Sequence, residues 1–276
     1  MKLAQTVAFF GNVPCRDAWG TNTFTGSLDT SKKPLRDTQI AARRILIVGP
    51  SVVRPPRNTV LLDGVAYIIG DAFPDYWFGD MLRSNWEIHK ADGLATIRTF
   101  AQAIAGAGGT TAYVGKVWQK DVKDPSETST VFNDVSFYLG VNEAVPDNAI
   151  IGLGGTNHIC QNQYDTASGY LEVKAQELAN PSITVVALST SVYSPVADTN
   201  TTTSSVVTAL VMRWQEGFKY LSQGTVQYHR GDLQMIVRKA DATPTTGSNL
   251  SYSGLDYTIL GIRGEGDCWS LHTRLA

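Results

Sequence analysis

Histidine and cysteine, the side chains that most often serve as proton carriers, nucleophiles or metal ligands, are few and isolated in this chain. They are Cys15, Cys160 and Cys268, and His89, His158, His229 and His272. An odd number of cysteines without metal-type spacing argues against a disulfide framework and favours a reducing compartment. We interpret Cys160 and Cys268 as small buried residues, and His89 and His272 as half-exposed residues of strands.

Glycines and carboxylates also match structural roles better than catalytic ones. The stretch Gly152-Leu153-Gly154-Gly155 is not followed by the Lys-Ser/Thr pair and helix of a phosphate-binding loop, so we expect a hairpin turn there. The pattern of an EF-hand does not occur. The sequence therefore predicts no catalytic residue, no metal site and no cofactor, and we expect a protein that is not an enzyme.

One aromatic cluster has a composition that suits binding. Tyr76, Trp77 and Phe78 follow Asp75 directly, in a stretch that we expect to be a loop. Aromatic rings stack on sugars and carboxylates accept hydrogen bonds from hydroxyl groups, so a carbohydrate-binding loop is one interpretation. The other is packing onto the protein itself or onto a neighbouring subunit, because exposed aromatic residues are enriched at interface hot spots.

The stretch from Gly231 to Leu275 predicts the kind of strands that would support such a loop. It contains four short stretches of alternating apolar residues separated by glycine-rich turns, a pattern typical of a small antiparallel barrel or sandwich. Ser253-Gly254 lies where a two-residue hairpin turn needs a positive φ, which glycine adopts at little cost.

The same spacing occurs twice more upstream. In each copy a proline-bearing loop precedes a glycine, a ring-bearing residue follows the glycine by three positions, and an apolar residue follows it by five. The copies contain Pro55, Pro56, Gly64, Tyr67 and Ile69; Pro146, Gly155, His158 and Cys160; and Pro244, Gly254, Tyr257 and Ile259. Because an internal repeat decides architecture before any single motif, we predict a mainly β protein with three tandem small antiparallel β-barrels, SH3-like, and one or two linking helices. Trp86, Tyr170 and Trp269 should then superpose within one residue.

The segments between the repeats complete the predicted organisation. Leu94, Ile97, Ala101 and Ile104 share one helical face, as do Val206, Leu210, Trp214 and Phe218 after a possible cap at Ser205. We therefore predict an extended N-terminal arm (1–38), a first barrel (39–91), a linking helix (92–111), a second barrel (112–180), a segment of strand, polar loop and linking helix (181–223), and a third barrel (224–276).

The composition excludes some classes of protein. The chain has 276 residues, 43% of them apolar, which is enough for two or three small cores. Its formal net charge is −2 and no block of like charges stands out, so no broad basic surface for duplex DNA is expected. No run of 18 apolar residues occurs, so we expect no transmembrane helix and no contact with a membrane.

Residues 231–276 resemble the head-closure (stopper) proteins of tailed bacteriophages and related neck proteins. The resemblance rests on an extended strand at Leu233 to Val237, a loop with Pro244, a Leu-x-x-x-Gly-x-x-Tyr-x-Ile hairpin at Leu250 to Ile259, and a final strand from Trp269 to Arg274. It implies a small β-barrel module that assembles into a ring between portal and tail, without catalytic residues. Family members usually have one module, whereas this chain has three, which leaves the symmetry and the layer of the ring open.

The leading hypothesis is accordingly a structural virion protein, assembled in the host cytoplasm as a homo-oligomeric ring at the head–tail junction. Its partners would be the portal or adaptor protein and tail proteins, with possible contact to packaged DNA in the lumen. Candidate interaction residues are those of the proline loops and the aromatic cluster, namely Pro55, Pro56, Tyr76, Trp77, Phe78, Pro146 and Pro244. A capsid-decoration or tail-tip protein and a carbohydrate-binding module are the alternatives.

Overall fold

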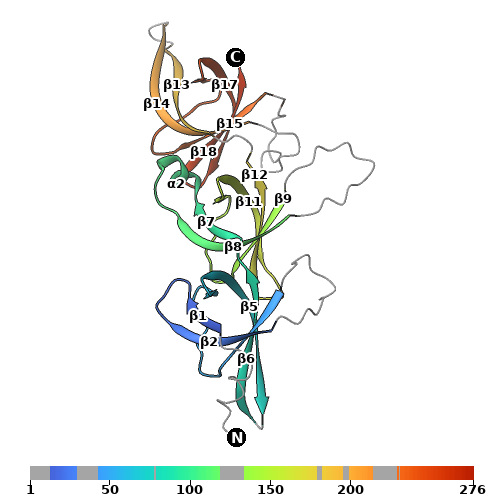
Figure 1. Cartoon of the computed structure of the whole chain (residues 1–276). Helices are drawn as coiled ribbons and strands as arrows, with labels where there is room; N and C mark the ends of the chain where they lie inside the picture. The colour runs from blue at the N-terminus through green and yellow to red at the C-terminus, as the bar shows by residue number, and fades with distance from the viewer. Residues whose placement is uncertain are drawn as a thin grey trace, which may run out of the picture.

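Three closed antiparallel barrels of six strands each form the molecule, and they follow one another along an elongated body (Figure 1). The computed structural model describes residues 13–29, 43–77, 79–118, 134–178, 182–194, 199–213, 229 and 231–276. The prediction of a mainly β protein with three tandem small barrels is confirmed.

Each barrel uses six consecutive strands. Barrel 1 consists of β1 (Val13–Asp17), β2 (Thr23–Asp29), β3 (Arg43–Val48), β4 (Thr59–Leu62), β5 (Val65–Trp77) and β6 (Asp80–Lys90). Barrel 2 consists of β7 (Gly93–Arg98), β8 (Thr110–Trp118), β9 (Asp134–Gly140), β10 (Ile150–Leu153), β11 (Thr156–Asp165) and β12 (Tyr170–Glu177). Barrel 3 consists of β13 (Ser182–Ser194), β14 (Thr199–Arg213), β15 (Leu233–Arg238), β16 (Asn249–Tyr252), β17 (Leu255–Glu265) and β18 (Cys268–Leu275). The short helix α2 (Phe100–Ala105) follows β7.

The three barrels share one topology. If the strands of a barrel are numbered one to six along the chain, their order around the barrel is 1-2-3-6-5-4 in all three cases. The predicted repeat corresponds to strands three to six of each barrel, which begin at β3, β9 and β15. The repeat is therefore a property of the fold.

The turn glycines occupy equivalent places in the three barrels. Gly64, Gly155 and Gly254 have φ values of 81°, 85° and 77° in the two-residue hairpins between strands four and five. The preceding residues Asp63, Gly154 and Ser253 also have positive φ, at 48°, 59° and 53°. Two positive φ values in succession define the type I′ turn, whose twist matches that of the flanking strands.

Pairing across these hairpins makes the residues after the turns equivalent as well. Tyr67 lies opposite Val60, His158 opposite Ile151, and Tyr257 opposite Leu250. The backbone N–H groups of Ile69, Cys160 and Ile259 donate to the carbonyl oxygens of Asn58, Ala149 and Ser248 at 2.7, 2.8 and 2.8 Å. A β-bulge follows each of these three donors directly. A bulge bends its strand and increases the local twist, which helps a small sheet to close on itself.

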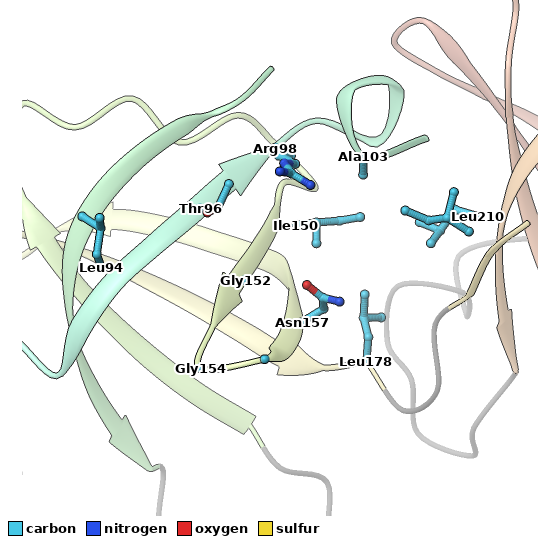
Figure 2. A pocket seen from close by; sticks show the side chains of 12 residues that line it. Leu94, Thr96, Arg98, Ala103, Ile150, Gly152, Gly154, Asn157, Leu178 and Leu210 are labelled. Carbon is cyan, nitrogen blue, oxygen red and sulfur yellow. The ribbon is translucent and has the colours of Figure 1, made fainter. Parts of the chain in front are cut away.

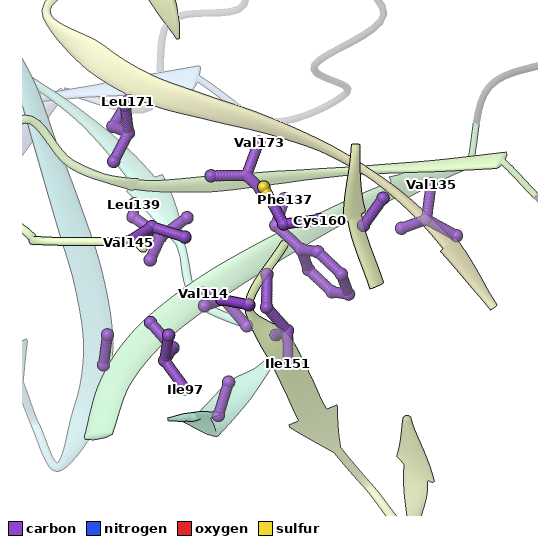
Figure 3. Close-up of a cluster of buried hydrophobic side chains, with 14 residues drawn as sticks. Ile97, Val114, Val135, Phe137, Leu139, Val145, Ile151, Cys160, Leu171 and Val173 are labelled. Carbon is purple, nitrogen blue, oxygen red and sulfur yellow. The ribbon is translucent and has the colours of Figure 1, made fainter. Parts of the chain in front are cut away.

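The cores lie inside the barrels and are made by alternate residues of their strands. In barrel 2, Phe137 is completely buried and packs among aliphatic residues from the surrounding strands (Figure 3). Its neighbours in the cluster include Ile97, Val114, Val135, Leu139, Ile151 and Val173. Barrel 1 is filled around Trp86 and barrel 3 around Met235.

Several of the early strands of the barrels differ from the predicted organisation. The predicted arm (1–38) contains β1 and β2, which close barrel 1, so deletion of the whole arm would open that barrel. Residues 93–98 of the predicted linking helix form β7, and only residues 100–105 are helical. The helical spacing of Leu94 and Ile97 was misleading, because Leu94 is 49% exposed while Ala95 and Ile97 alternate into the barrel.

The predicted helix after Ser205 is also wrong over its described part, because residues 199–213 form the strand β14. Val207, Ala209 and Val211 point into the barrel, whereas Leu210 and Met212 pack outside it against α2. Burial on both faces produces a continuous apolar run in which the alternation of a strand is hidden. Trp214 and Phe218 lie outside the described residues.

The predicted superposition of three aromatic residues in the last strands is not exact. Trp269 lies opposite Val237, and the equivalent residue of barrel 2 is Leu171, so Tyr170 differs by one position. Trp86 lies opposite Leu46 and differs by two. Only the Tyr170 part of the prediction therefore holds within the stated tolerance.

We expect Gly64→Ala to lower the free energy of unfolding by about 1 kcal/mol, because a residue with a Cβ is strained in the left-handed region. A Cβ at Gly64 would have no atom within 4 Å, so the cost is conformational. Urea denaturation measures it. Gly49→Ala is the matched control, since Gly49 has equally open surroundings without the left-handed φ, and it should not destabilise. Equal losses in both variants would contradict the turn assignment.

Candidate interaction surfaces

The proline-bearing loops join strands three and four of each barrel. The loops of barrels 1 and 2 contact each other. Pro55 is buried and Pro56 is exposed, while Pro146 is exposed and Pro244 is buried. The Asn142 side chain of the second loop donates to the carbonyl oxygen of Pro56 at 2.8 Å. These two loops therefore help to join barrel 1 to barrel 2, and a role for them in contacts with other molecules stays a prediction.

An arginine from the first loop organises this junction. The Arg57 guanidinium binds both carboxylate oxygens of Glu143, with Nε–Oε1 at 2.8 Å and Nη2–Oε2 at 2.6 Å. It also lies over the Trp19 ring at 3.8 Å, and Trp19 packs on Tyr113 of barrel 2. A bidentate, stacked arginine fixes orientation better than a point charge does. The relative rotation of the two barrels is thus held by planar contacts.

Barrel 2 also packs an aromatic ring against the outer face of barrel 1. Tyr170 is completely buried among Ala66, Ile68 and Ala91, although it belongs to β12. Its hydroxyl group donates to the carbonyl oxygen of Glu87 at 3.4 Å. Gly70 lies under the ring, where any Cβ would overlap it. This contact explains why Tyr170 does not occupy the barrel-interior position of Trp269.

Barrels 2 and 3 meet through an apolar cluster around α2. Phe100, Ala103 and Ile104 of the helix pack with Leu210 and Met212 of β14, together with Ile150, Ile159, Leu178, Ile236 and Cys268. The helix is short but well capped: the Thr99 hydroxyl accepts from the Gln102 N–H, and the Gln102 side chain accepts from the Thr99 N–H. The helix therefore fills the space between the barrels as a wedge.

A pocket of about 500 Å³ opens beside this wedge. Figure 2 shows Leu210 entering from barrel 3, while Ile150 and Leu178 come from barrel 2. Arg98 and Asn157 add the larger polar side chains of its lining. The described lining combines aliphatic side chains with Arg98 and Asn157, which are able to orient a bound molecule.

Three of the four histidines and all three cysteines are buried. His89 and His272 are 8% and 3% exposed, so the prediction of half-exposed positions is wrong for both. His158 is completely buried with its ring edge-on to Phe137, and burial lowers the pKa of its imidazole. Burial raises the pKa of the Cys15, Cys160 and Cys268 thiols to about 11, which leaves them protonated and unreactive. His229 is exposed.

His272 is buried because a carboxylate and an arginine accompany it. Asp232, itself 2% exposed, contacts His272 Nε2 at 2.7 Å and receives Nε and Nη2 of Arg274 at 2.8 and 2.9 Å. Burial alone would raise the pKa of Asp232, but the hydrogen bonds from Arg274, from the His229 N–H and from His272 lower it overall. The cluster ties the start of β15 to the end of β18, which is a structural role.

Two ribbons project beyond the barrels, one from barrel 1 and one from barrel 3 (Figure 1). The first is the outer part of the β5/β6 hairpin, where Asp75 lies opposite Arg83 and Tyr76 opposite Met81. The second is the outer part of the β13/β14 hairpin, which stays paired out to Ser194 and Thr199. Within the described residues, the outer part of each ribbon pairs with neither neighbouring strand of its barrel. Each ribbon therefore has backbone edges that a closed barrel otherwise lacks.

The predicted aromatic cluster lies on the first ribbon. Tyr76 is 63% exposed, Phe73 is 55% exposed, and Met81 is 38% exposed. The Asp75 carboxylate is bound by Arg83 at 2.5 Å, and hydrogen bonds from Arg83 and Asn85 lower its pKa. Trp77 continues the strand, and Phe78 lies outside the described residues. The structure thus exposes two aromatic rings on an element that extends away from the core.

Among the described residues, no group of three His, Cys, Asp or Glu side chains is placed to hold a metal ion. The described part of the chain also contains no helix with the length and apolar character needed to cross a membrane. Comparisons with protein-family models, with curated proteins and with solved structures returned no match.

The wedge between barrels 2 and 3 predicts a strong effect of charge at Leu210, which is 2% exposed. Leu210→Asp should lower the free energy of unfolding by several kcal/mol, because it buries a carboxylate in an apolar contact. Val206→Asp is the control on the same strand, where Val206 is 73% exposed, and it should change stability little. Thermal unfolding measures both. A Leu210→Asp variant that melts like the parent would show that the two barrels are not docked.

A second prediction concerns Glu265, whose side chain is 7% exposed and lies 3.6 Å from Arg263 Nε. Burial raises the pKa of Glu265 to about 7. Because the folded state then binds the proton more tightly than the unfolded state, stability should fall as pH rises from about 4.5 to about 7.

Glu265→Gln should remove this decline, which denaturant titrations across that pH range measure. Asp241→Asn is the control, because Asp241 pairs with Arg238 at the surface and is 24% exposed. An equal slope in Glu265→Gln and the parent would contradict the assignment.

Proposed function

We propose that this protein is a structural component of a tailed-bacteriophage virion that forms a ring at the head–tail junction. In this role it links the portal or adaptor protein to the tail and helps to retain packaged DNA. The resemblance of residues 231–276 to head-closure proteins suggests the location. The tandem barrels support a role in binding and assembly, since each provides loops and ribbons on a rigid support.

The observation that carries the proposal is the pair of projecting ribbons. Closed barrels bury every strand edge, so a monomer built only of barrels gives a neighbour no backbone to pair with. This chain instead extends one hairpin from barrel 1 and another from barrel 3, at opposite ends of the body (Figure 1). A two-stranded ribbon is only marginally stable alone. A partner that packs against it supplies the missing contacts.

The two ribbons suit different partners. The β5/β6 ribbon exposes Phe73 and Tyr76, which are the kind of side chains that form interface hot spots. We assign it to the contact with a different protein of the junction. Among the described residues, the third proline loop, with Pro244, makes no hydrogen bond to another proline loop like the one between Asn142 and Pro56. We assign this third loop to the lumen or to a neighbouring subunit.

The same exposed rings are the observation that favours the runner-up, a carbohydrate-binding module. Asp75 would be the hydroxyl acceptor beside Tyr76, but its carboxylate is already bound by Arg83. A sugar would therefore have to compete with an ion pair. Binding to a glycan array that Tyr76→Ala abolishes would favour this alternative.

The proposal predicts where the protein is found. Labelling of purified virions with an antibody to the chain should mark the head–tail junction in electron micrographs, and genes for a portal or terminase should flank its own gene. Phe73→Ala with Tyr76→Ala should reduce joining of heads to tails in a complementation assay, because these rings are solvent-exposed and their loss leaves the barrel core intact. Val53→Ala is a control at an exposed apolar residue of a loop in the same barrel. Label on the capsid faces or the tail tip, or an association with polysaccharide-degrading genes, would contradict the proposal.

A further inference from the structure

The two ribbons differ in how their edges are protected. On the β5/β6 ribbon, Arg54 donates to the carbonyl oxygens of Ile69 and Gly70, and the Asp71 N–H donates to Ser168 of barrel 2. Pro74 has no N–H to offer, and the ribbon carries charges along its length. Charges, proline and intramolecular cover are the devices by which proteins prevent edge pairing. This edge is therefore guarded.

The strands of the β13/β14 ribbon have neither charged residues nor proline along residues 182–194 and 199–212. From Ser182 to Met212 the sequence contains one charged residue, Asp198, and one proline, Pro195, and both lie in the connection between the strands. The strands themselves are rich in threonine and valine, which have high β propensity. A long, uncharged edge of this composition readily accepts another strand.

Both edges of this ribbon extend past their barrel neighbours. Strand β16 pairs with β13 only at residues 187–189, so residues 190–194 of β13 continue beyond it. Strand β15 pairs with β14 only at residues 209–213, so the edge at residues 203–208 continues beyond it. Within the described part of the chain, β13 and β14 are the only strands that pair with each other there. Backbone groups on the two outer sides are thus available to water or to an added strand.

The outer face of the ribbon is apolar near its base. Ile183, Val185 and Val206 are 50%, 61% and 73% exposed. They continue the face on which Leu210 and Met212 already pack against α2. An added strand beside β14 would bring side chains next to Val206. The edge and the face therefore favour the same kind of occupant, an uncharged β-strand.

We propose that this occupant is the equivalent ribbon of a second copy of the chain. The outer edge of β14 in one copy pairs antiparallel with the outer edge of β13 in the next, staggered by a few residues as in any closed sheet. No like charges then oppose one another, because neither edge has a charge. A contact between two different edges repeats from copy to copy, and it gives a closed ring when the rotation between neighbouring copies closes.

This inference rests on the proposed function in one respect, the closure of a ring of identical copies. It adds the contact that builds the ring, a continuous β-belt formed by the β13/β14 ribbons. The β5/β6 ribbon remains available to other proteins, since its guarded edge takes no part. Edge pairing over a few residues is weak, so a purified chain is monomeric when dilute and associates on concentration or on a template.

The test is sedimentation velocity over a wide range of protein concentration, with two shortened variants. In the first, an Asn-Gly turn replaces residues 190–203 and joins Ser189 to Ser204, which lie directly opposite each other. In the second, an Asn-Gly turn replaces residues 76–82 and joins Asp75 to Arg83, which are likewise opposed. Both leave the pairing within the barrels intact. Circular dichroism and melting temperature verify that each variant folds.

The parent chain and the β5/β6-shortened variant should form species larger than a dimer as concentration rises, whereas the β13/β14-shortened variant should stay monomeric. Association of that variant, or a monomeric parent at every concentration, would overturn the belt. Association of the parent chain that stops at the dimer would also overturn the belt.

Val206→Cys provides a second criterion, since the native thiols of Cys15, Cys160 and Cys268 are all buried. In the belt, residue 206 does not oppose its own copy, so oxidation should yield no rapid disulfide dimer; such a dimer would indicate twofold self-pairing instead. Failure of the proposed function would look different. A belt would still form in solution, but antibody labelling would not mark the head–tail junction.

Discussion

Closure of a small sheet is the constraint from which most of this structure follows. Six short strands must each find two neighbours, because an unpaired backbone group in a protein interior costs as much as a lost hydrogen bond. The chain meets this requirement three times with one strand order, one type I′ turn and one bulge placed directly after the fifth residue beyond the turn glycine. The side chains that fill the barrels vary widely around this shared backbone scheme.

Much of that scheme could be predicted from sequence because its signals are local. Gly64, Gly155 and Gly254 mark turns that need positive φ, and Ile69, Cys160 and Ile259 follow at a fixed distance. Some of the early strands were assigned differently for physical reasons: β1 and β2 to an arm, β7 to a helix, and β14 to a polar loop and a helix. Strand β7 is short and runs into a helix, so its apolar residues fit a helical period by chance. Strand β14 is apolar on both faces near its end and polar near its start.

The candidate surfaces also divide into features that have a local sequence signal and features that have none. The local cluster of aromatic residues beside Asp75 pointed to Tyr76, but Tyr76 lies in strand β5 and not in the expected loop. The start of β14 was interpreted as a polar loop because threonine and serine are polar, although threonine favours strands. The contacts of Arg57 with Glu143 and Trp19 join residues far apart in the chain, and no local pattern signals them. Contacts of this kind can be identified only when the positions of the barrels relative to each other are known.

The two junctions between barrels differ in chemistry. Barrel 1 is joined to barrel 2 by a stacked ion pair and by packing around Tyr170, whereas α2 joins barrel 2 to barrel 3 through apolar packing. Apolar contacts weaken on cooling, and a partly buried ion pair is screened by salt less than an exposed one. The first junction therefore combines polar and apolar contacts, and the second depends mainly on apolar ones.

The three buried cysteines make it possible to measure which part of the molecule opens first. Cys15 belongs to barrel 1, Cys160 to barrel 2 and Cys268 to barrel 3, and all three thiols are buried and unpaired. Cys15 and Cys160 lie in the cores of barrels 1 and 2, whereas Cys268 lies in the apolar cluster between barrels 2 and 3. A thiol reagent therefore reaches them when barrel 1, barrel 2 or the junction of barrels 2 and 3 opens, and the order in which three masses appear on a labelled peptide map reports the order of these openings. If a force or a template opens one end of the molecule, the cysteine that is labelled would thus identify that end.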